Sequence, residues 1–297
     1  MNISHLATNK RLIKAMIGIT YEEFTELCDK FEKVYIEYKL NNKNRKRALG
    51  GGQKGHLPTM DAKLLFILFY IKTYPTMDVL GFFFGKSSGR STEAVHLFMT
   101  ILKKALGREI VLPERKIRSV EEFLEKFPEV KDILLDGTER KIQRPKYKKS
   151  QKRNYSGKKK THTRKNLVVV DENKRILALS ATRMGRTHDK RILNEMTLNL
   201  PDNIGKFGDT AFIGMDKMYA NTVVPKKRNR NNPLTEKDKE NNRIISSIRV
   251  VVEHALAGIK KFRAVSDRFR NRLGRFDDDL MLVVCGLHNY HIKRHSA

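Results

Sequence analysis

Residues 248–263, IRVVVEHALAGIKKFR, decide how the chain is interpreted, because they predict an amphipathic helix with a single acid on its polar edge. At about 100° per residue, Arg249 lies about 40° from Glu253, and Lys260 lies about 20° from it. A carboxylate beside residues that favour burial either pairs with a cation or binds a metal ion. Glu253 is therefore the first candidate functional residue. The opposite side is mostly apolar and carries Val250, Val251, Leu256 and Phe262.

The net charge is the dominant global property of the sequence. The 297 residues include 61 Lys and Arg against 33 Asp and Glu, which gives a formal charge of +28 and a pI near 10.1. Such a balance predicts a polyanionic partner, and nucleic acid is the first expectation. A ribosome-like or generally basic protein is the less specific alternative. The length allows one large or two modest domains.

Cysteine usage and hydropathy favour a cytoplasmic protein. Cys28 and Cys285 lie far apart in apolar helical patterns, so we expect two reduced core residues rather than a disulfide. The first residues lack the continuous apolar core of a cleavable signal. No stretch approaches the ~18 apolar residues of a membrane span, so we expect no membrane partner.

The N-terminal third predicts helices. Residues 20–40 open with a capping box of Thr20 and Glu23 and then repeat apolar residues at helical spacing. Residues 41–58 are basic and glycine-rich, which is typical of a flexible linker.

Three further helical patterns fill residues 60–107, with breaks at Pro75 and at 85–90, GKSSGR. The first pattern predicts a buried support helix. The other two, the second capped by Ser91, are compatible with a helix-turn-helix whose second helix enters a major groove, and equally with an ordinary helical bundle. Arg90 and Ser91 are the candidate DNA contacts of this region.

From about residue 130 the periodicity changes to that of strands. Residues 131–143, 166–182 and 221–226 are β patterns, and residues 171–174, DENK, predict a turn. Helices are expected at 189–200, 235–263 and 277–294, and a short strand at 206–212. The order predicts a mixed α/β sheet flanked by helices.

Two aspartates join Glu253 as candidate metal ligands. Asp136 follows an apolar strand and precedes a glycine, and Asp209 repeats that setting in FGDTAF. Carboxylates are hard oxygen ligands that suit Mg²⁺ or Mn²⁺. Two such ions ~4 Å apart activate the attacking oxygen and stabilise the leaving oxygen in phosphodiester cleavage.

The succession LLDGTERKIQRP, YSGKKKTHTRK, GRTHDKRIL, FGDTAFIG and IRVVVEHALAGIKKFR resembles DDE transposases of the insertion-sequence-five kind, which are related to the eukaryotic PIF/Harbinger transposases. The resemblance covers roughly residues 130–290, and residues 60–107 resemble the helix-turn-helix region of that family. It implies an RNase H-like sheet and divalent-metal-dependent DNA cleavage and strand transfer. It also implies two Mg²⁺ or Mn²⁺ ions.

The resemblance assigns the catalytic and metal-binding roles to Asp136, Asp209 and Glu253. The last helix of the family carries Tyr, Arg, Glu and Lys at fixed spacing; here Arg249, Glu253 and Lys260 match, whereas Ser246 stands at the tyrosine position. Arg249 and Lys260 either neutralise Glu253 or contact DNA, and the motif favours DNA. Asp189, in GRTHD, is the rival for the second aspartate; Asp209 is favoured because it follows a strand.

Residues 138–165 hold 13 Lys or Arg against one acid, with Tyr147 and Tyr155 interleaved. A solvated hairpin loop would carry mixed charge, so this bias favours a track for phosphates with salt-sensitive, largely sequence-independent contacts. The candidate DNA-binding residues here are Lys158, Lys159, Lys160, His162 and Arg164.

A zinc site was also considered on the last helix, where Cys285, His288, His291 and His295 have helical spacing. Four ligands within one helix fan out rather than converge, so the pattern disfavours such a site. The acids at 277–279 fit N-capping of that helix better than metal binding.

The sequence thus predicts residues 1–115 as a helical DNA-binding domain and residues 128–297 as an RNase H-like catalytic domain. The expected function is a transposase that acts on terminal inverted repeats and target double-stranded DNA as a homodimer or higher oligomer. Two alternatives stay open. They are a structure-specific nuclease on the same fold and a non-catalytic DNA-binding protein derived from a transposase.

Overall fold

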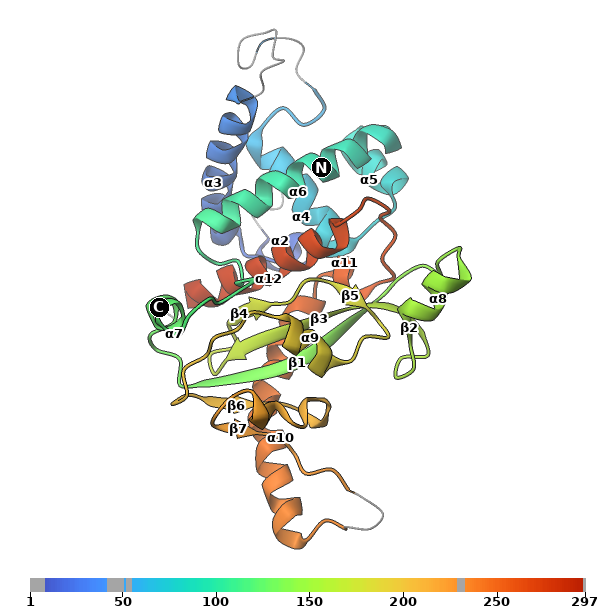
Figure 1. The fold of residues 1–297 in the computed structure, drawn as a ribbon. Coiled ribbons are helices and arrows are strands. Elements are labelled where there is room, and N and C mark those ends of the chain that lie inside the picture. The colour runs from blue at the N-terminus through green and yellow to red at the C-terminus, as the bar shows by residue number, and fades with distance from the viewer. Residues whose placement is uncertain (1–8, 42–50, 52–54, 229–232, 296–297) are drawn as a thin grey trace. The chain divides into compact units, whose positions relative to one another are not determined.

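The computed structural model describes residues 9–41, 51, 55–228 and 233–295, and these form two compact units (Figure 1). The helical unit comprises Met1–Leu112, Lys260–Asp267 and Leu273–Ala297, and the sheet unit comprises Pro113–Ile259 and Arg268–Arg272. These units differ from the predicted domains, because the last helix returns to the N-terminal helices. Most of the predicted linker, residues 41–58, lies outside the described residues.

The helical unit is built around a helix that is buried on every side. Residues 64–71 of this helix, α4, are all buried, as expected of the predicted support helix. The predicted capping box opens α3, because Thr20 Oγ1 accepts from Glu23 N–H and Glu23 Oε2 accepts from Thr20 N–H. The helices are α2 (Lys10–Ile17), α3 (Tyr21–Leu40), α4 (Met60–Thr73), α5 (Met77–Phe84), α6 (Ser88–Arg108), α11 (Arg263–Ser266) and α12 (Phe276–His295).

The turn between α5 and α6 is shorter than predicted. Gly85, with φ 65°, ends α5, and α6 already begins at Ser88, with Ser87 as its N-cap. Ser87 Oγ accepts from Arg90 N–H at 3.4 Å. The prediction that Ser91 caps this helix is therefore wrong, because the earlier serine fills that role and Ser91 is fully buried inside the first turns.

Both cysteines are buried free thiols in the helical unit, which confirms the prediction of reduced core residues. Among the described residues, no helix is long and apolar enough to cross a membrane.

The sheet unit is a mixed α/β fold, as predicted, and is consistent with the RNase H-like arrangement that the resemblance implies. Its strands are β1 (Asp132–Lys141), β2 (Tyr155–Ser156), β3 (Thr161–Asp171), β4 (Ile176–Leu179), β5 (Arg183–Met184), β6 (Gly205–Phe207) and β7 (Thr222–Val223). Their order is β2-β3-β1-β6-β7, and β4 and β5 also pair with β3. The long strand β1 runs antiparallel to β3 and parallel to β6.

Helices cover the sheet on both faces. In Figure 1, α9 (Asp189–Glu195) lies in front of the sheet and α10 (Glu236–Lys260) passes behind it. The front core combines alternate residues of β1 and β3 with α9, for example Leu135, Val169 and Ile192. Since neighbouring residues of a strand point to opposite faces, Asp136 points to the face that α10 covers. Also present are α7 (Val120–Lys126), α8 (Lys148–Asn154), and the 3₁₀ helices η1 (Thr210–Phe212) and η2 (Met215–Lys217).

Candidate active site

The two aspartates stand at equivalent positions of neighbouring parallel strands. Leu134 of β1 is in register with Phe207 of β6, and each aspartate, Asp136 and Asp209, follows two residues later. Parallel strands bring their carboxyl ends to one edge of a sheet. Asp209 lies just beyond its strand and caps η1, where its Oδ1 accepts from Ala211 N–H at 2.7 Å. Asp136 lies within β1 and Asp209 just beyond β6, at matching distances from a paired residue, and the charge of Asp209 acts on Asp136.

Asp136 is largely buried and has a cationic neighbour. The Nη2 atom of Arg249, on α10, lies 3.7 Å from Asp136 Oδ1, and both side chains are 19% exposed. Burial raises the pKa of Asp136, and the charge of Arg249 and a backbone hydrogen bond from Gly137 only partly offset this; Asp209 and Asp189 add to the rise. The site holds more negative charge than Arg249 neutralises.

Glu253 lies one helical turn beyond Arg249 on α10 and is exposed. Residues four apart on a helix are neighbours on its surface, so Glu253 follows directly after the residue that contacts Asp136. The acid that Arg249 contacts is Asp136 rather than Glu253. Lys260 is exposed at the last position of α10.

The buried side of α10 differs from the predicted apolar face. Val250 is 41% exposed, and Phe262 lies beyond the end of the helix. The buried face is rotated by about one residue from the predicted apolar face, because Arg249 on the polar edge contacts Asp136 of the sheet. The buried residues of α10 are Ile245, Val252, Ala255, Leu256 and Ile259.

Asp189 occupies the other side of β1. It begins α9, and its Oδ1 lies 3.0 Å from Lys165 Nζ. A Cβ added to Gly137 would lie 2.8 Å from the Asp189 carboxylate, so this glycine is what lets the acid approach the strand. Gly137 and Asp136 are adjacent, and their side-chain positions therefore face opposite sides of the sheet.

The donor set suits a hard divalent cation. In the part of the chain that the structure describes, the ligand atoms of Asp136, Asp209 and Glu253 do not form a group within 4.8 Å. The three candidates nevertheless offer carboxylate oxygens, which are the ligands that Mg²⁺ and Mn²⁺ prefer. A divalent cation would offset the cost of burying the Asp136 charge, which is the main cause of its raised pKa, and the smaller repulsion from Asp209 and Asp189. The residues present therefore fit such an ion.

A cleft of about 1050 Å³ opens in the sheet unit, and Asp136 and Glu253 are not among the residues that line it. Asp209 and Asp189 line it, together with two predicted DNA-binding residues, Lys158 and His162. Other basic residues also line the cleft; two of them belong to the predicted basic segment 138–165, and Arg186 lies within the GRTHD motif. These residues are Arg144, Lys152, Arg186 and Lys227.

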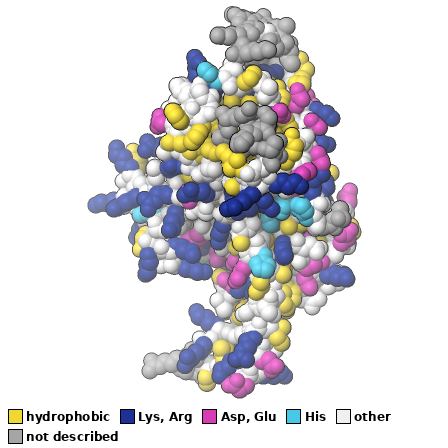
Figure 2. Space-filling view, turned by 180° about the vertical axis from the view of Figure 1, so that it is seen from behind, with side chains coloured by type: hydrophobic (Ala, Val, Ile, Leu, Met, Phe, Trp, Pro, Cys, Tyr) yellow, Lys and Arg dark blue, Asp and Glu magenta, His cyan; other side chains and the backbone are white. Residues whose placement is uncertain are grey.

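The remaining predicted DNA-binding residues lie in different settings. Lys159 and Lys160 are exposed in the turn before β3, and Arg164 lines a second depression of about 800 Å³ with other arginines. Figure 2 shows Lys and Arg side chains gathered on the side of the sheet unit where α8 and β2 project in Figure 1. In the helical unit, Arg90 is exposed, whereas Ser91 is buried and offers no surface to DNA.

Replacing Asp136 by Asn is expected to stabilise the metal-free protein at neutral pH. The buried carboxylate has a raised pKa, so its cost to the folded state appears as pH rises above the unfolded-state pKa and is complete above the folded-state pKa. Denaturant unfolding at acid and at neutral pH checks this: the advantage of the variant should be small in acid and larger at neutral pH. A less stable variant at neutral pH would mean that the contact with Arg249 outweighs burial.

Comparisons with known proteins identify a family and a relative. Residues 135–289, which include all four candidate carboxylates, match the family model described as "DDE superfamily endonuclease". A curated relative, "Probable transposase for insertion sequence element IS702" from Microchaete diplosiphon, is 28% identical over 282 residues, covering 95% of each chain. No solved structure matches. Both matches support an enzyme with a transposase function. Because the family model spans more than half of the chain, this protein belongs to the DDE superfamily endonucleases.

Proposed function

We propose that this protein is a transposase that cleaves the ends of a DNA element and joins them to target DNA with the help of divalent metal ions. The observation that carries the proposal is the parallel pairing of β1, which holds Asp136, with β6, which Asp209 follows, together with the contact between Asp136 and Arg249 of α10. The order of the motifs supports a relation to the insertion-sequence-five transposases. The substrate would be the double-stranded DNA of the nucleoid.

In the proposed mechanism, Asp136, Asp209 and Glu253 hold two Mg²⁺ or Mn²⁺ ions. When bound, these ions supply activation of the attacking oxygen and stabilisation of the leaving oxygen. Arg249 and Lys260 contact DNA phosphates near the bond that is cleaved, as the motif implies. Asp136 contributes a carboxylate whose charge is costly to bury without a cation, which favours metal binding.

Asp209 is the better second ligand than Asp189. The parallel pairing of Leu134 with Phe207, two residues before each aspartate, supports Asp209 as the neighbour of Asp136. Asp189 faces the opposite side of β1 and pairs with Lys165. We therefore assign Asp189 to shaping the cleft through Lys165.

The DNA is proposed to lie along the basic cleft and the turn before β3. Lys158 and His162 line the cleft, and Lys159 and Lys160 extend its cationic surface. The helices α5 and α6, with Arg90 exposed in the first turn of α6, are proposed as the helix-turn-helix that recognises the terminal inverted repeats. One copy of the chain at each element end would give a homodimer or higher oligomer.

Strand transfer separates this function from its alternatives. The full chain is incubated with Mg²⁺ or Mn²⁺ and DNA that carries the inverted repeats flanking its gene, together with a target plasmid. Joined products support the transposase. Cleavage without joining indicates a structure-specific nuclease, and binding without cleavage indicates a non-catalytic DNA-binding protein.

Neutralising the turn before β3 is expected to weaken DNA binding in a strongly salt-dependent manner. The triple variant K158Q/K159Q/K160N uses Asn at position 160 because Lys160 has φ 52°, which Asn tolerates. If each lysine neutralises one phosphate, the magnitude of the negative slope of log K for DNA binding against log salt decreases by up to about 2.7. Fluorescence anisotropy at several salt concentrations measures this slope.

The matched control is K116Q/R118Q/K131Q, which removes the same charge from exposed positions at the start of β1 and before it. This control is expected to change the slope by less than about 1. An equal change in both triple variants would show that net charge, rather than the turn before β3, determines binding.

A further inference from the structure

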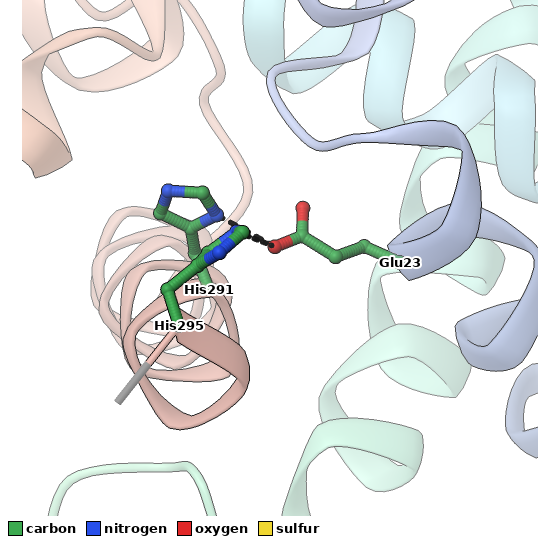
Figure 3. Close-up of side chains that lie close together, drawn as sticks. All are labelled: Glu23, His291 and His295. Carbon is green, nitrogen blue, oxygen red and sulfur yellow. Dashed lines mark hydrogen bonds and ion pairs between the residues drawn. The ribbon is translucent and has the colours of Figure 1, made fainter. Parts of the chain in front are cut away.

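Three side chains of metal-binding types meet within the helical unit, outside the unit that holds the candidate active site. Glu23 of α3, His291 and His295 of α12 have ligand atoms that all lie within 4.8 Å of one another. His291 Nδ1 lies 2.6 Å from Glu23 Oε1, and His295 Nε2 lies 3.4 Å from the same oxygen. Figure 3 shows the two imidazole rings of α12 beside one oxygen of the carboxylate. Of the described residues, no other group of three or more His, Cys, Asp or Glu meets this distance.

The local folds of the two helices fix this arrangement. His291 and His295 are one turn apart, so helical geometry places both rings on one face of α12, with ring centroids 4.3 Å apart. Glu23 is the third residue of α3, and its Oε2 accepts from Thr20 N–H at 2.7 Å. The capping box therefore holds the carboxylate and leaves Oε1 facing the histidines.

The carboxylate is available as an anion. The Glu23 side chain is only 2% exposed. Burial would raise its pKa, but hydrogen bonds from His291 and from Thr20 N–H, with the charges of both histidines, leave the pKa below its ordinary value. A buried carboxylate beside two imidazoles is satisfied by a proton on His291 or by a metal ion.

We propose that Glu23, His291 and His295 bind a zinc ion, with water completing the coordination. Two imidazole nitrogens and one carboxylate oxygen are a donor set for zinc, and nitrogen donors disfavour Mg²⁺. Ligand atoms ~2.1 Å from one tetrahedral ion lie ~3.4 Å from each other, which the Glu23–His295 distance already matches. The Glu23–His291 hydrogen bond would open by less than an ångström when zinc replaces the proton.

This site revises the argument against zinc on the last helix. Four ligands within α12 do not converge, and Cys285 and His288 are indeed buried away from this group. The third ligand instead comes from α3, 268 residues earlier. His295 is 57% exposed, so the ion has an open path from solvent. The bound ion would link the C-terminal turn of α12 to the first turn of α3.

Zinc binding is tested on the untagged full chain after removal of metals with a chelator. Zinc chloride is titrated in the presence of excess Mg²⁺, which occupies oxygen-only sites and leaves the histidines free. The wild-type chain is expected to bind one zinc ion at this site. His291→Ala and His295→Ala are each expected to weaken that binding by at least about tenfold, the smallest loss seen when metal-site partners are removed. His56→Ala, an exposed histidine of the same unit, should bind as the wild type does.

Two further measurements keep the result independent of folding. Circular dichroism should show native helix content in His295→Ala, because that side chain is mostly exposed. Zinc should raise the thermal midpoint of the wild type and of His56→Ala, but not of His295→Ala. Unchanged zinc binding in both alanine variants, or no zinc retained by the wild type in excess Mg²⁺, overturns the proposal.

Discussion

Asp136→Asn is expected to reduce DNA cleavage by at least about 1,000-fold, which corresponds to about 4 kcal/mol of lost transition-state stabilisation. The amide lacks the charge that a hard cation needs, and Asp136 is the acid that α10 approaches. DNA binding should persist, since the basic cleft is unchanged. Cleavage of an element-end substrate under single-turnover conditions measures the loss, and anisotropy measures binding.

The matched variants locate the rest of the metal site. Asp209→Asn and Glu253→Gln are expected to lose cleavage as severely as Asp136→Asn, and each should bind fewer Mn²⁺ ions by electron paramagnetic resonance. Asp189→Asn changes the same chemical group on the opposite side of β1 and should retain Mn²⁺ binding. Loss of Mn²⁺ in Asp189→Asn but not in Asp209→Asn would exchange their roles. Full cleavage by Asp136→Asn would contradict the proposed mechanism altogether.

Deleting residues 273–297 is expected to unfold the helical unit. The helix α12 buries at least six large apolar side chains, and Gly286 allows it to approach Leu106 and Leu112 closely. At about 1.5–3 kcal/mol each, an upper estimate, their burial contributes about 9–18 kcal/mol, whereas whole domains are stable by about 5–15 kcal/mol. Circular dichroism should show a lower helix content, and calorimetry should show that the unfolding transition of the helical unit is absent.

The control for this deletion ends the chain after His291. It keeps every buried residue of α12, and the described residues that it removes, 292–295, are partly or fully exposed. Its unfolding transition should remain cooperative, with a modest decrease in the midpoint from the lost ion pair between Arg294 and Glu26. A cooperative helical transition in the longer deletion would show that the N-terminal helices form a stable core alone.

Local patterns predicted much of the fold correctly. The capping box at Thr20, the buried helix at residues 64–71 and the DENK turn all depend on neighbours within a few residues. The error at Ser91 came from the same kind of signal, because Ser87 and Ser91 are both plausible caps and packing decides between them. The short helix α8 was missed because its residues are almost all polar and basic, and they give no apolar period.

The site depends on long-range pairing, which a single sequence specifies weakly. The contexts of Asp136 and Asp209 predicted strand ends, but only the β1–β6 register shows that the strands are parallel neighbours. The pairing of Arg249 with Asp136 instead of Glu253 depends on which face of α10 meets the sheet. The convergence of Glu23 with His291 likewise joins two helices whose sequences carry no sign of one another.

The helical unit is assembled from both ends of the chain, and this imposes an order on biosynthesis. The N-terminal helices leave the ribosome first, but α12 follows only after the whole sheet unit has been made. At about 5–20 residues per second, the roughly 160 intervening residues delay it by about 8–30 s. During that interval the sheet unit can fold while the apolar surface of α6 awaits its partner. A chain that lacks α12 would therefore contain the sheet unit without a finished helical unit.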